Sequence, residues 1–285
     1  MTMRPHQWVK NLFVLAPLIF AQKLSDPRRV TLAFSATLLF SLVSSAVYVF
    51  NDLLDREADR QHPVKRFRPL ASGALSPRAG IVLIAALVFF AVSGGIWVNP
   101  LFLGVAATYG LLNVAYSARL KHIPFVDVTV IAVGFICRVI AGAVAIDVAI
   151  SKWLLICTFL LAIFLGLGKR RHELAQLSEN AQRSRQVLER YSLRALDVAM
   201  PIVGLLTWIA YVLYTVAAET ALKFGTRRLI VSAPLIVIAL FRFLQLARRS
   251  RVKDSPTDAM LRDPIVVGSA LLWGATVIAV IYHVL

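Results

Sequence analysis

The sequence predicts an all-α protein that crosses a membrane about nine times. Of its 285 residues, 59% are hydrophobic and only 16% are charged, and the mean hydropathy is +0.74. Soluble domains do not reach such values. Apolar stretches of roughly 20 residues also recur along the whole chain, as transmembrane helices require. Both observations indicate a polytopic membrane bundle.

The expected spans follow one another with short polar connections. In order, they cover about 8 to 22, 30 to 51, 79 to 96, 100 to 117, 124 to 146, 151 to 168, 195 to 218, 229 to 247 and 264 to 284. The first is the shortest, and its basic start and apolar core are also typical of a signal peptide. Because eight further spans follow, we interpret it as a retained helix.

Two longer polar segments interrupt this pattern, near 52 to 78 and 169 to 194. They follow the second and sixth expected spans. No soluble accessory domain is apparent between or beyond them. We therefore expect a single membrane-embedded catalytic domain over 1 to 285, with these two segments as loops at the membrane surface.

The net charge of +16 does not indicate a nucleic-acid-binding protein. The basic residues are scattered among hydrophobic spans and do not cover one soluble face. If the N-terminus is cytoplasmic, most of the 31 Lys and Arg residues fall on the cytoplasmic side, as the positive-inside rule requires. The sequence thus predicts a multi-pass protein of the cell membrane, with both long loops and any active site facing the cytoplasm.

The loop after the second span begins with three regularly spaced carboxylates, those of Asp52, Asp55 and Asp59. Spacings of three and four place them on one helical face, as a strip about 10 Å long. Such a strip suits Mg²⁺, which takes one or two carboxylates and completes its octahedron with water and phosphate oxygens. Solvated charges on an interfacial loop are the alternative, but the shared face favours a metal.

A basic cluster follows the carboxylates at once. It consists of Lys65, Arg66 and Arg68. Arginine can grip phosphate oxygens with its planar fork and lysine can act as a point charge. Asn51 precedes the carboxylates at the membrane edge. The segment therefore predicts a site for a phosphorylated ligand carried with a metal.

Arg138 lies in the middle of the fifth expected span. An unpaired charge there costs at least ~2.5 kcal/mol, so the side chain should face a cavity or a partner. We favour contact with a ligand, and a structural ion pair or bonds to carbonyl groups are the alternative. Arg242 sits nearer a span end, where it can snorkel to the interface.

Two motifs make the chain recognisable. The pattern NDxxDxxxD with the following RxRPLxSG resembles the first aspartate motif of the UbiA superfamily of intramembrane prenyltransferases, and AYSARLKHIPFVDV resembles that superfamily's Tyr-x-x-x-Leu-Lys stretch. The resemblance implies a nine-helix bundle that binds a magnesium-diphosphate substrate over a membrane-embedded cavity. It implies that Asp52, Asp55 and Asp59 are the catalytic metal ligands and that Tyr116 and Lys121 contact substrate.

Three further segments resemble the decaprenyl-phosphate phosphoribosyltransferase branch of that superfamily: RPHQWVKN, HPVKRFRP and GKRRHEL. The branch moves a 5-phosphoribosyl group from phosphoribosyl pyrophosphate to a polyprenyl (decaprenyl) phosphate, releasing pyrophosphate, toward the cell-wall arabinan donor. The resemblance implies this Mg²⁺-dependent activity here. It also implies that an N-terminal set lines the polar mouth of the cavity: Arg4, Gln7, Lys10 and Asn11. As an alternative, Arg4 and Lys10 are simple positive-inside anchors.

The loop after the sixth span departs from the wider superfamily. Prenyltransferases with aromatic acceptors usually carry a second aspartate motif there, whereas this chain reads KRRHELAQLS. Lys169 and Arg170 would suit a substrate with an additional phosphate, such as the 5-phosphate of the ribose donor. Glu173 could add one carboxylate to the site or could simply be solvated. Asp197 is a further candidate carboxylate, with the same alternative.

Two other functions are alternatives to this one. A prenyltransferase of the same fold would move a prenyl group from a prenyl diphosphate to an aromatic or other small acceptor, and the missing second aspartate motif counts against it. A transporter would place charges and broken helices near mid-membrane with access from both sides, whereas here the charges gather at one face.

In the phosphoribosyl transfer, the lipid phosphate is already anionic, so no strong general base is needed. An intramembrane enzyme of this type could also form a homo-oligomer.

Overall fold

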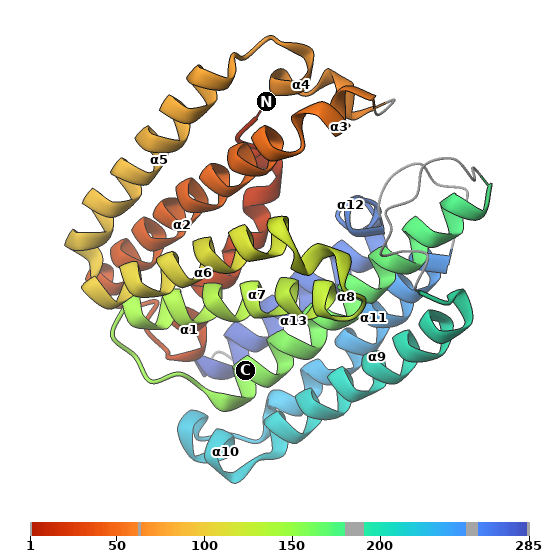
Figure 1. The fold of residues 1–285 in the computed structure, drawn as a ribbon. Helices are drawn as coiled ribbons and strands as arrows, with labels where there is room; N and C mark the ends of the chain where they lie inside the picture. Colours follow the sequence, from red (N-terminus) through yellow and green to blue (C-terminus); the bar gives the residue numbers. More distant parts are fainter. Residues whose placement is uncertain (1, 62–63, 180–190, 249–255, 284–285) are drawn as a thin grey trace. The chain divides into compact units, whose positions relative to one another are not determined.

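The structure is a computed structural model that describes residues 2 to 61, 64 to 179, 191 to 248 and 256 to 283. Every regular element in these ranges is helical (Figure 1). Eight of the described helices are long and apolar enough to cross a membrane. The all-α prediction is confirmed, and the number of spans agrees approximately with the nine expected.

The chain divides into two compact units. The first comprises 1 to 118 and 134 to 150, and the second comprises 119 to 133 and 151 to 285. Helix α7 (Val126–Ala145) contributes its first residues to the second unit and the remainder to the first. The expectation of one catalytic domain remains a prediction.

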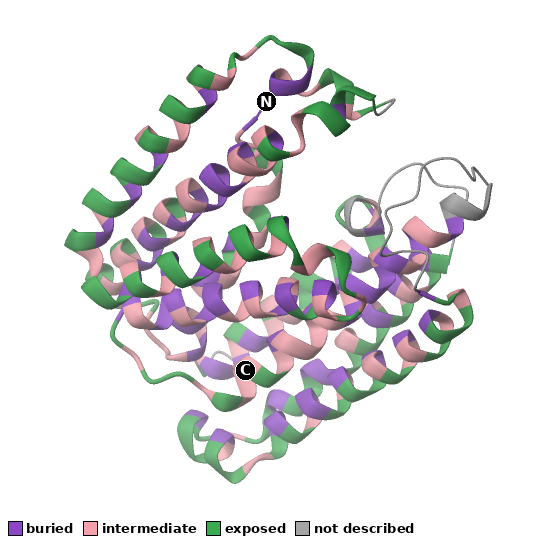
Figure 2. Ribbon diagram, viewed as in Figure 1, coloured by how far each residue is buried: buried purple, intermediate pink, exposed green. Residues whose placement is uncertain are grey.

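The first unit contains three long helices besides its part of α7, namely α2 (Pro27–Leu54), α5 (Pro77–Val98) and α6 (Pro100–Ala118). Its shorter elements are η1 (Pro5–Leu15), α1 (Ala16–Phe20), α3 (Arg56–Gln61), η2 (Lys65–Phe67) and α4 (Pro69–Ser72). Helix α5 carries many exposed apolar side chains, including Ile81, Phe89 and Phe90 (Figure 2). Such a surface is stable only in contact with hydrocarbon or a partner, which fits a membrane-spanning helix.

The first expected span differs from a regular transmembrane helix. Residues 5 to 15 form a 3₁₀ helix, and only Ala16–Phe20 continues as an α-helix. This segment packs tightly on α7, where a Cβ at Gly142 would lie 1.9 Å from the carbonyl oxygen of Val14. Only glycine fits at that position. Apolar composition predicted the segment correctly as a helix but could not predict its tighter winding.

The second unit contains α8 (Lys152–Glu179), α9 (Leu193–Val216), α11 (Ala233–Arg248) and α13 (Pro264–Ile281). Shorter elements connect them: η3 (Leu120–His122), α10 (Ala218–Phe224), η5 (Arg228–Ser232) and α12 (Pro256–Met260). The core of α8, α9 and α11 includes Phe164, Met200 and Phe243. Gly168 permits this packing, because a Cβ there would come within 2.5 Å of the Phe243 ring.

The loop expected near 169 to 194 begins as a helix. Helix α8 continues to Glu179, and Ala175 in this extension is buried. Leu174 also packs against the core of the unit, which explains why the helix does not end where the charged residues begin. Residues 180 to 190 lie outside the described parts of the chain. The earlier loop, 52 to 78, holds α3, η2 and α4.

Candidate metal and phosphate site

The predicted aspartate strip lies where α2 ends. The helix stops at Leu54, Asp55 is its C-cap, and α3 restarts at Arg56. Asp52 and Asp59 are buried, at 2% and 3% exposure. The continuous helical strip of three carboxylates is therefore a wrong prediction in its geometry, because the helix is interrupted at the middle aspartate.

Asp52 and Asp59 nevertheless converge on one positive charge. The Nη1 atom of Arg68 lies 3.1 Å from Asp52 Oδ1 and 2.6 Å from Asp59 Oδ2. Arg4 also forms an ion pair with Asp52, and the Nζ of Lys65 lies 3.9 Å from Asp59 Oδ1. Four predicted site residues in the loop and one at the N-terminus thus meet in a single cluster within the first unit.

The backbone around Arg68 explains how it reaches the carboxylates. Arg68 precedes Pro69 and has φ −63° and ψ 142°, the extended conformation that a following proline favours. Two other arginines fasten α3 to the segment after it: Arg56 Nε donates to the carbonyl of Leu70 at 3.2 Å, and Arg60 Nε to that of Ala71 at 3.1 Å. Leu70 is fully buried against α2 and α5 residues. The loop is thereby held over the end of α2.

Arg4 is positioned by its own backbone and by an aromatic ring. It adopts a left-handed conformation with φ 49°, and its guanidinium lies 5.1 Å from the centre of the Tyr48 ring. Tyr48 precedes Asp52 by one helical turn. Tyr48 is not among the residues that the sequence predicted for the site, although an aromatic residue one turn before the first aspartate is a usable signal for a cation-π contact.

The described residues contain no group of three or more His, Cys, Asp or Glu side chains placed to hold a metal ion. Asp52 and Asp59 supply two buried carboxylates, which share one cation, the guanidinium of Arg68. Mg²⁺ is commonly bound through one or two carboxylates plus water and phosphate oxygens. The pair therefore fits a metal that takes its remaining ligands from a phosphorylated substrate.

The other residues predicted for the site differ in burial and in the partners that they contact. The hydroxyl of Ser117, which the sequence did not reveal as a site residue, donates to Asn51 Oδ1 at 2.5 Å. Arg66 is exposed and stacks on Phe67 at 4.9 Å. The remaining predicted contacts are half-buried: Gln7, Lys10, Tyr116, Lys121 and Lys169.

Arg138 belongs to a buried network inside the first unit. Its Nε donates to Asn11 Oδ1 at 2.8 Å, and its two terminal nitrogens donate to the carbonyl of Gly134 at 2.8 Å and to Tyr109 Oη at 3.0 Å. Asn11 in turn donates to Ser41 Oγ at 2.9 Å. The structure therefore supports the structural alternative for Arg138, whose hydrogen bonds to Gly134, Asn11 and Tyr109 hold helices together, and it places Asn11 in the same network.

A second charged cluster lies in the second unit. Arg170 Nε pairs with Asp127 Oδ2 at 2.6 Å, and its Nη1 pairs with Glu173. Asp127 and Arg170 are almost completely buried, at 0% and 2% exposure. Tyr191 donates to Asp127 Oδ1 at 2.6 Å and accepts from the Phe125 backbone N–H at 2.6 Å.

Burial and the bond to Asp127 raise the pKa of the Tyr191 phenol. The hydroxyl therefore stays protonated and keeps donating to the carboxylate. This cluster fixes the beginning of α7 to α8 and presents Glu173, whose side chain is 28% exposed. Asp127 was missed as a functional candidate, although an acidic residue entering an apolar stretch is the signal that could have found it.

Comparison with known proteins identifies the class. Residues 11 to 262 match the model of the UbiA prenyltransferase family. The decaprenyl-phosphate phosphoribosyltransferase of Mycobacterium tuberculosis is 32% identical, over 96% of this chain and 91% of the relative. That of Corynebacterium glutamicum is 31% identical, over 98% of this chain and 85% of the relative. The protein belongs to the UbiA prenyltransferase family of membrane enzymes.

The fold agrees with this assignment. A UbiA homolog from Archaeoglobus fulgidus, solved bound to GPP and Mg²⁺, superimposes with a TM-score of 0.72 and covers 99% of this chain and 98% of its own. Its sequence identity is 19%, so the similarity extends to the fold alone. The resemblance to this family that the aspartate motif suggested is confirmed.

Proposed function

We propose that this protein transfers the 5-phosphoribosyl group of phosphoribosyl pyrophosphate to a polyprenyl phosphate and releases pyrophosphate. The observation that carries the proposal is the convergence of Asp52 and Asp59 on one cation, with Arg4, Arg68 and Lys65 at the same place. The activity named for its relatives in Mycobacterium tuberculosis and Corynebacterium glutamicum supports the choice of substrates.

Asp52 and Asp59 would hold Mg²⁺, with Asp55 as a third candidate ligand. When bound, the metal neutralises negative charge that develops on the departing pyrophosphate. In its absence Arg68 and Arg4 supply positive charge to these carboxylates. Arg68 and Arg4 would contact the phosphate oxygens of the donor, for which their planar guanidinium groups are well suited.

The remaining basic residues have a binding role in this proposal. Lys65 and Arg66 would hold pyrophosphate oxygens as the anomeric C–O bond breaks and negative charge grows on the leaving group. Within the second unit, Arg170 would position Glu173 through its buried pair with Asp127. A polyprenyl phosphate is anionic near neutral pH, so it can attack without a strong general base.

The proposed enzyme is a multi-pass protein of the cell membrane with its active site on the cytoplasmic side. The water-soluble donor, phosphoribosyl pyrophosphate, is then available on the side of the membrane where the basic loops are expected. The product would serve as a precursor of cell-wall arabinan. Bringing a soluble donor to a membrane-bound acceptor in one orientation supplies much of the expected rate enhancement.

The direct test uses purified protein in detergent with Mg²⁺, phosphoribosyl pyrophosphate labelled in the ribose, and a polyprenyl phosphate. We expect label to enter the organic phase only when all components are present. A parallel reaction contains a labelled prenyl diphosphate and an aromatic acceptor. Label that stays aqueous in the first reaction while the second forms product would favour the prenyltransferase alternative.

A further inference from the structure

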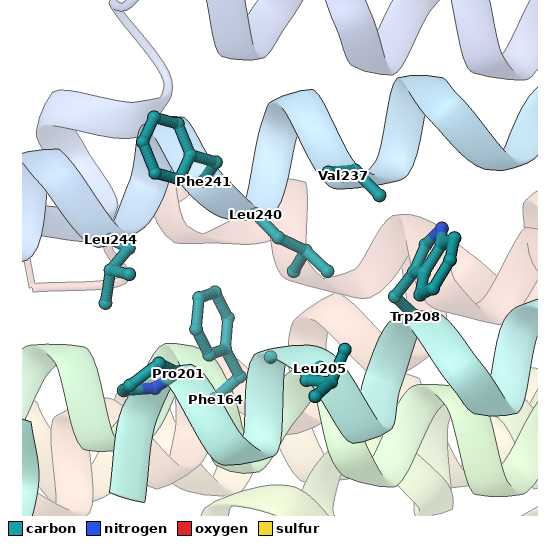
Figure 3. Close-up of a pocket in the computed structure, with 9 residues that line it drawn as sticks. Phe164, Pro201, Leu205, Trp208, Val237, Leu240, Phe241 and Leu244 are labelled. Atoms are coloured by element: carbon teal, nitrogen blue, oxygen red, sulfur yellow. The ribbon is translucent and has the colours of Figure 1, made fainter. Parts of the chain in front are cut away.

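A separate apolar groove lies in the second unit, between α9 and α11. Its volume is about 410 Å³, and the ring of Phe164 from α8 forms part of its lining. Figure 3 shows Pro201 and Trp208 on one helix facing Leu244 and Val237 on the other. None of the residues that line it belongs to the metal and phosphate site.

The groove is built into α9 by its sequence. Pro201 lies inside the helix, and Gly204 leaves the space occupied by the Phe164 ring, since a Cβ at Gly204 would lie 3.0 Å from that ring. The Nε1 atom of Trp208 is buried and has no hydrogen-bond partner among the described residues.

Positive charge gathers one helical turn from one end of this groove. Asp197 precedes Pro201 by four residues, and Arg248 follows Leu244 by four, which corresponds to about 6 Å along each helix. Arg171 pairs with Asp197 at 3.0 Å and donates to the Arg248 carbonyl at 3.1 Å. Arg248 lies 3.8 Å from the same Asp197 carboxylate and its side chain is 48% exposed.

The two arginines share one carboxylate, so the described residues at this end of the groove carry an excess of positive charge. Arg194 on the first turn of α9 is exposed and adds to it. Both α9 and the segment that contains α11 are apolar enough to cross a membrane. The medium outside the groove is then lipid hydrocarbon, and the end with the arginines is at an interface, where acidic headgroups are attracted to basic side chains.

We propose that this groove binds a bilayer phospholipid with an acidic headgroup. One acyl chain lies between α9 and α11, and the headgroup phosphate contacts Arg248. The apolar lining matches the hydrocarbon, and the arginine excess matches the anion. The groove extends over eight residues of each helix, about 10 Å, which suits part of an acyl chain and is far shorter than a long polyprenyl chain.

The test is native mass spectrometry of the full-length protein in detergent, equilibrated with equal amounts of phosphatidylglycerol and phosphatidylcholine of distinguishable mass. We expect the wild type to retain phosphatidylglycerol in preference. Leu205→Trp fills the groove and should abolish the lipid adduct. Its matched control is Leu206→Trp, at a neighbouring exposed position that does not line the groove, and there the adduct should persist.

A second pair of variants tests the headgroup contact without filling the groove. Arg248→Gln should weaken retention of phosphatidylglycerol about fivefold, the effect of one basic residue near an acidic lipid, and should leave phosphatidylcholine unchanged. Arg228→Gln, at the other end of the same span, should have no effect. This comparison remains decisive even if Leu205→Trp fails to fold.

Several outcomes would overturn the proposal. They are equal retention of the two phospholipids by the wild type, equal adducts in Leu205→Trp and Leu206→Trp, and displacement of the phospholipid by added polyprenyl phosphate. A change of oligomeric mass in Leu205→Trp with unchanged lipid retention would instead assign the groove to a second copy of the chain.

Discussion

Arg68 is the central residue of the candidate site, because its side chain lies between the two carboxylates that are the candidate metal ligands. Its Nη1 atom contacts both Asp52 and Asp59. A cation arriving at this pair must therefore displace a guanidinium. Competition between Arg68 and Mg²⁺ follows, and it can be measured without any catalytic turnover.

Arg68→Gln should bind Mg²⁺ more tightly than the wild type when no substrate is present. Removing the competing charge is expected to improve affinity about tenfold, equivalent to about 1.4 kcal/mol, while the KM for the donor rises because one phosphate contact is lost. Isothermal titration calorimetry measures the affinity. Arg66→Gln is the control, since Arg66 is exposed and stacks on Phe67. Unchanged or weaker Mg²⁺ binding in Arg68→Gln would show that the arginine does not compete with the metal.

The buried pair of Asp127 and Arg170 should matter for stability more than any surface pair. Asp127→Asn removes the fully buried charge partner of Arg170, which is itself almost completely buried, and a loss of about 3 kcal/mol or more is expected. Thermal unfolding in detergent measures it. Lys152→Gln removes an ion pair whose side chains are 65% and 68% exposed, and less than about 1 kcal/mol is expected there. Equal effects of the two substitutions would contradict the structural role of the cluster.

At the scale of elements, the sequence predicted where helices run better than where they end. Hydropathy located every long apolar helix, because burial in hydrocarbon depends on composition alone. It could not predict the break at Asp55 or the continuation of α8 to Glu179, since these depend on tertiary contacts of Leu70 and Leu174. The aspartate motif identified the right segment, but the role of Arg68 as a bridge required the positions of three side chains.

The start of α13 offers a pH-dependent test of one such contact. Asp263 accepts from the backbone N–H groups of Ile265 and Val266 and pairs with Arg242 Nη2 at 2.8 Å. Arg242 is thus held by a carboxylate. The sequence predicted that its side chain could snorkel to the membrane interface, but it did not predict this partner. The hydrogen bond from Arg242 holds the pKa of the Asp263 carboxyl below its usual value.

Because that pKa is lowered on folding, the stabilisation is present above the unfolded value of about 3.9 and is lost as the pH falls through the folded value. Asp263→Asn should therefore unfold at a lower temperature than the wild type at pH 7, and the difference should shrink below about pH 4. Melting curves of both proteins across pH 3 to 7 measure this. A difference that stays constant over the range would exclude an ionic origin.

At the scale of the whole molecule, the distribution of charge predicts the orientation in the membrane. Arg66→Cys and Arg227→Cys place a thiol at exposed positions on opposite predicted sides, and the native Cys137 and Cys157 lie within apolar helices. A membrane-impermeant maleimide should label Arg227→Cys in intact cells, and Arg66→Cys only after permeabilisation. The reverse pattern would place the candidate site outside the cell.

The measurement that tests the central claim most directly is Mg²⁺-dependent release of pyrophosphate from phosphoribosyl pyrophosphate, compared among wild type, Asp59→Asn and Glu57→Gln. Asp59 is buried against Arg68, whereas the nearby Glu57 side chain is 74% exposed. We predict polyprenyl-phosphate-dependent release by the wild type and Glu57→Gln, and a loss of about a hundredfold or more in Asp59→Asn, the order expected when an essential electrostatic contact is removed. Full activity in a folded Asp59→Asn protein would contradict the account.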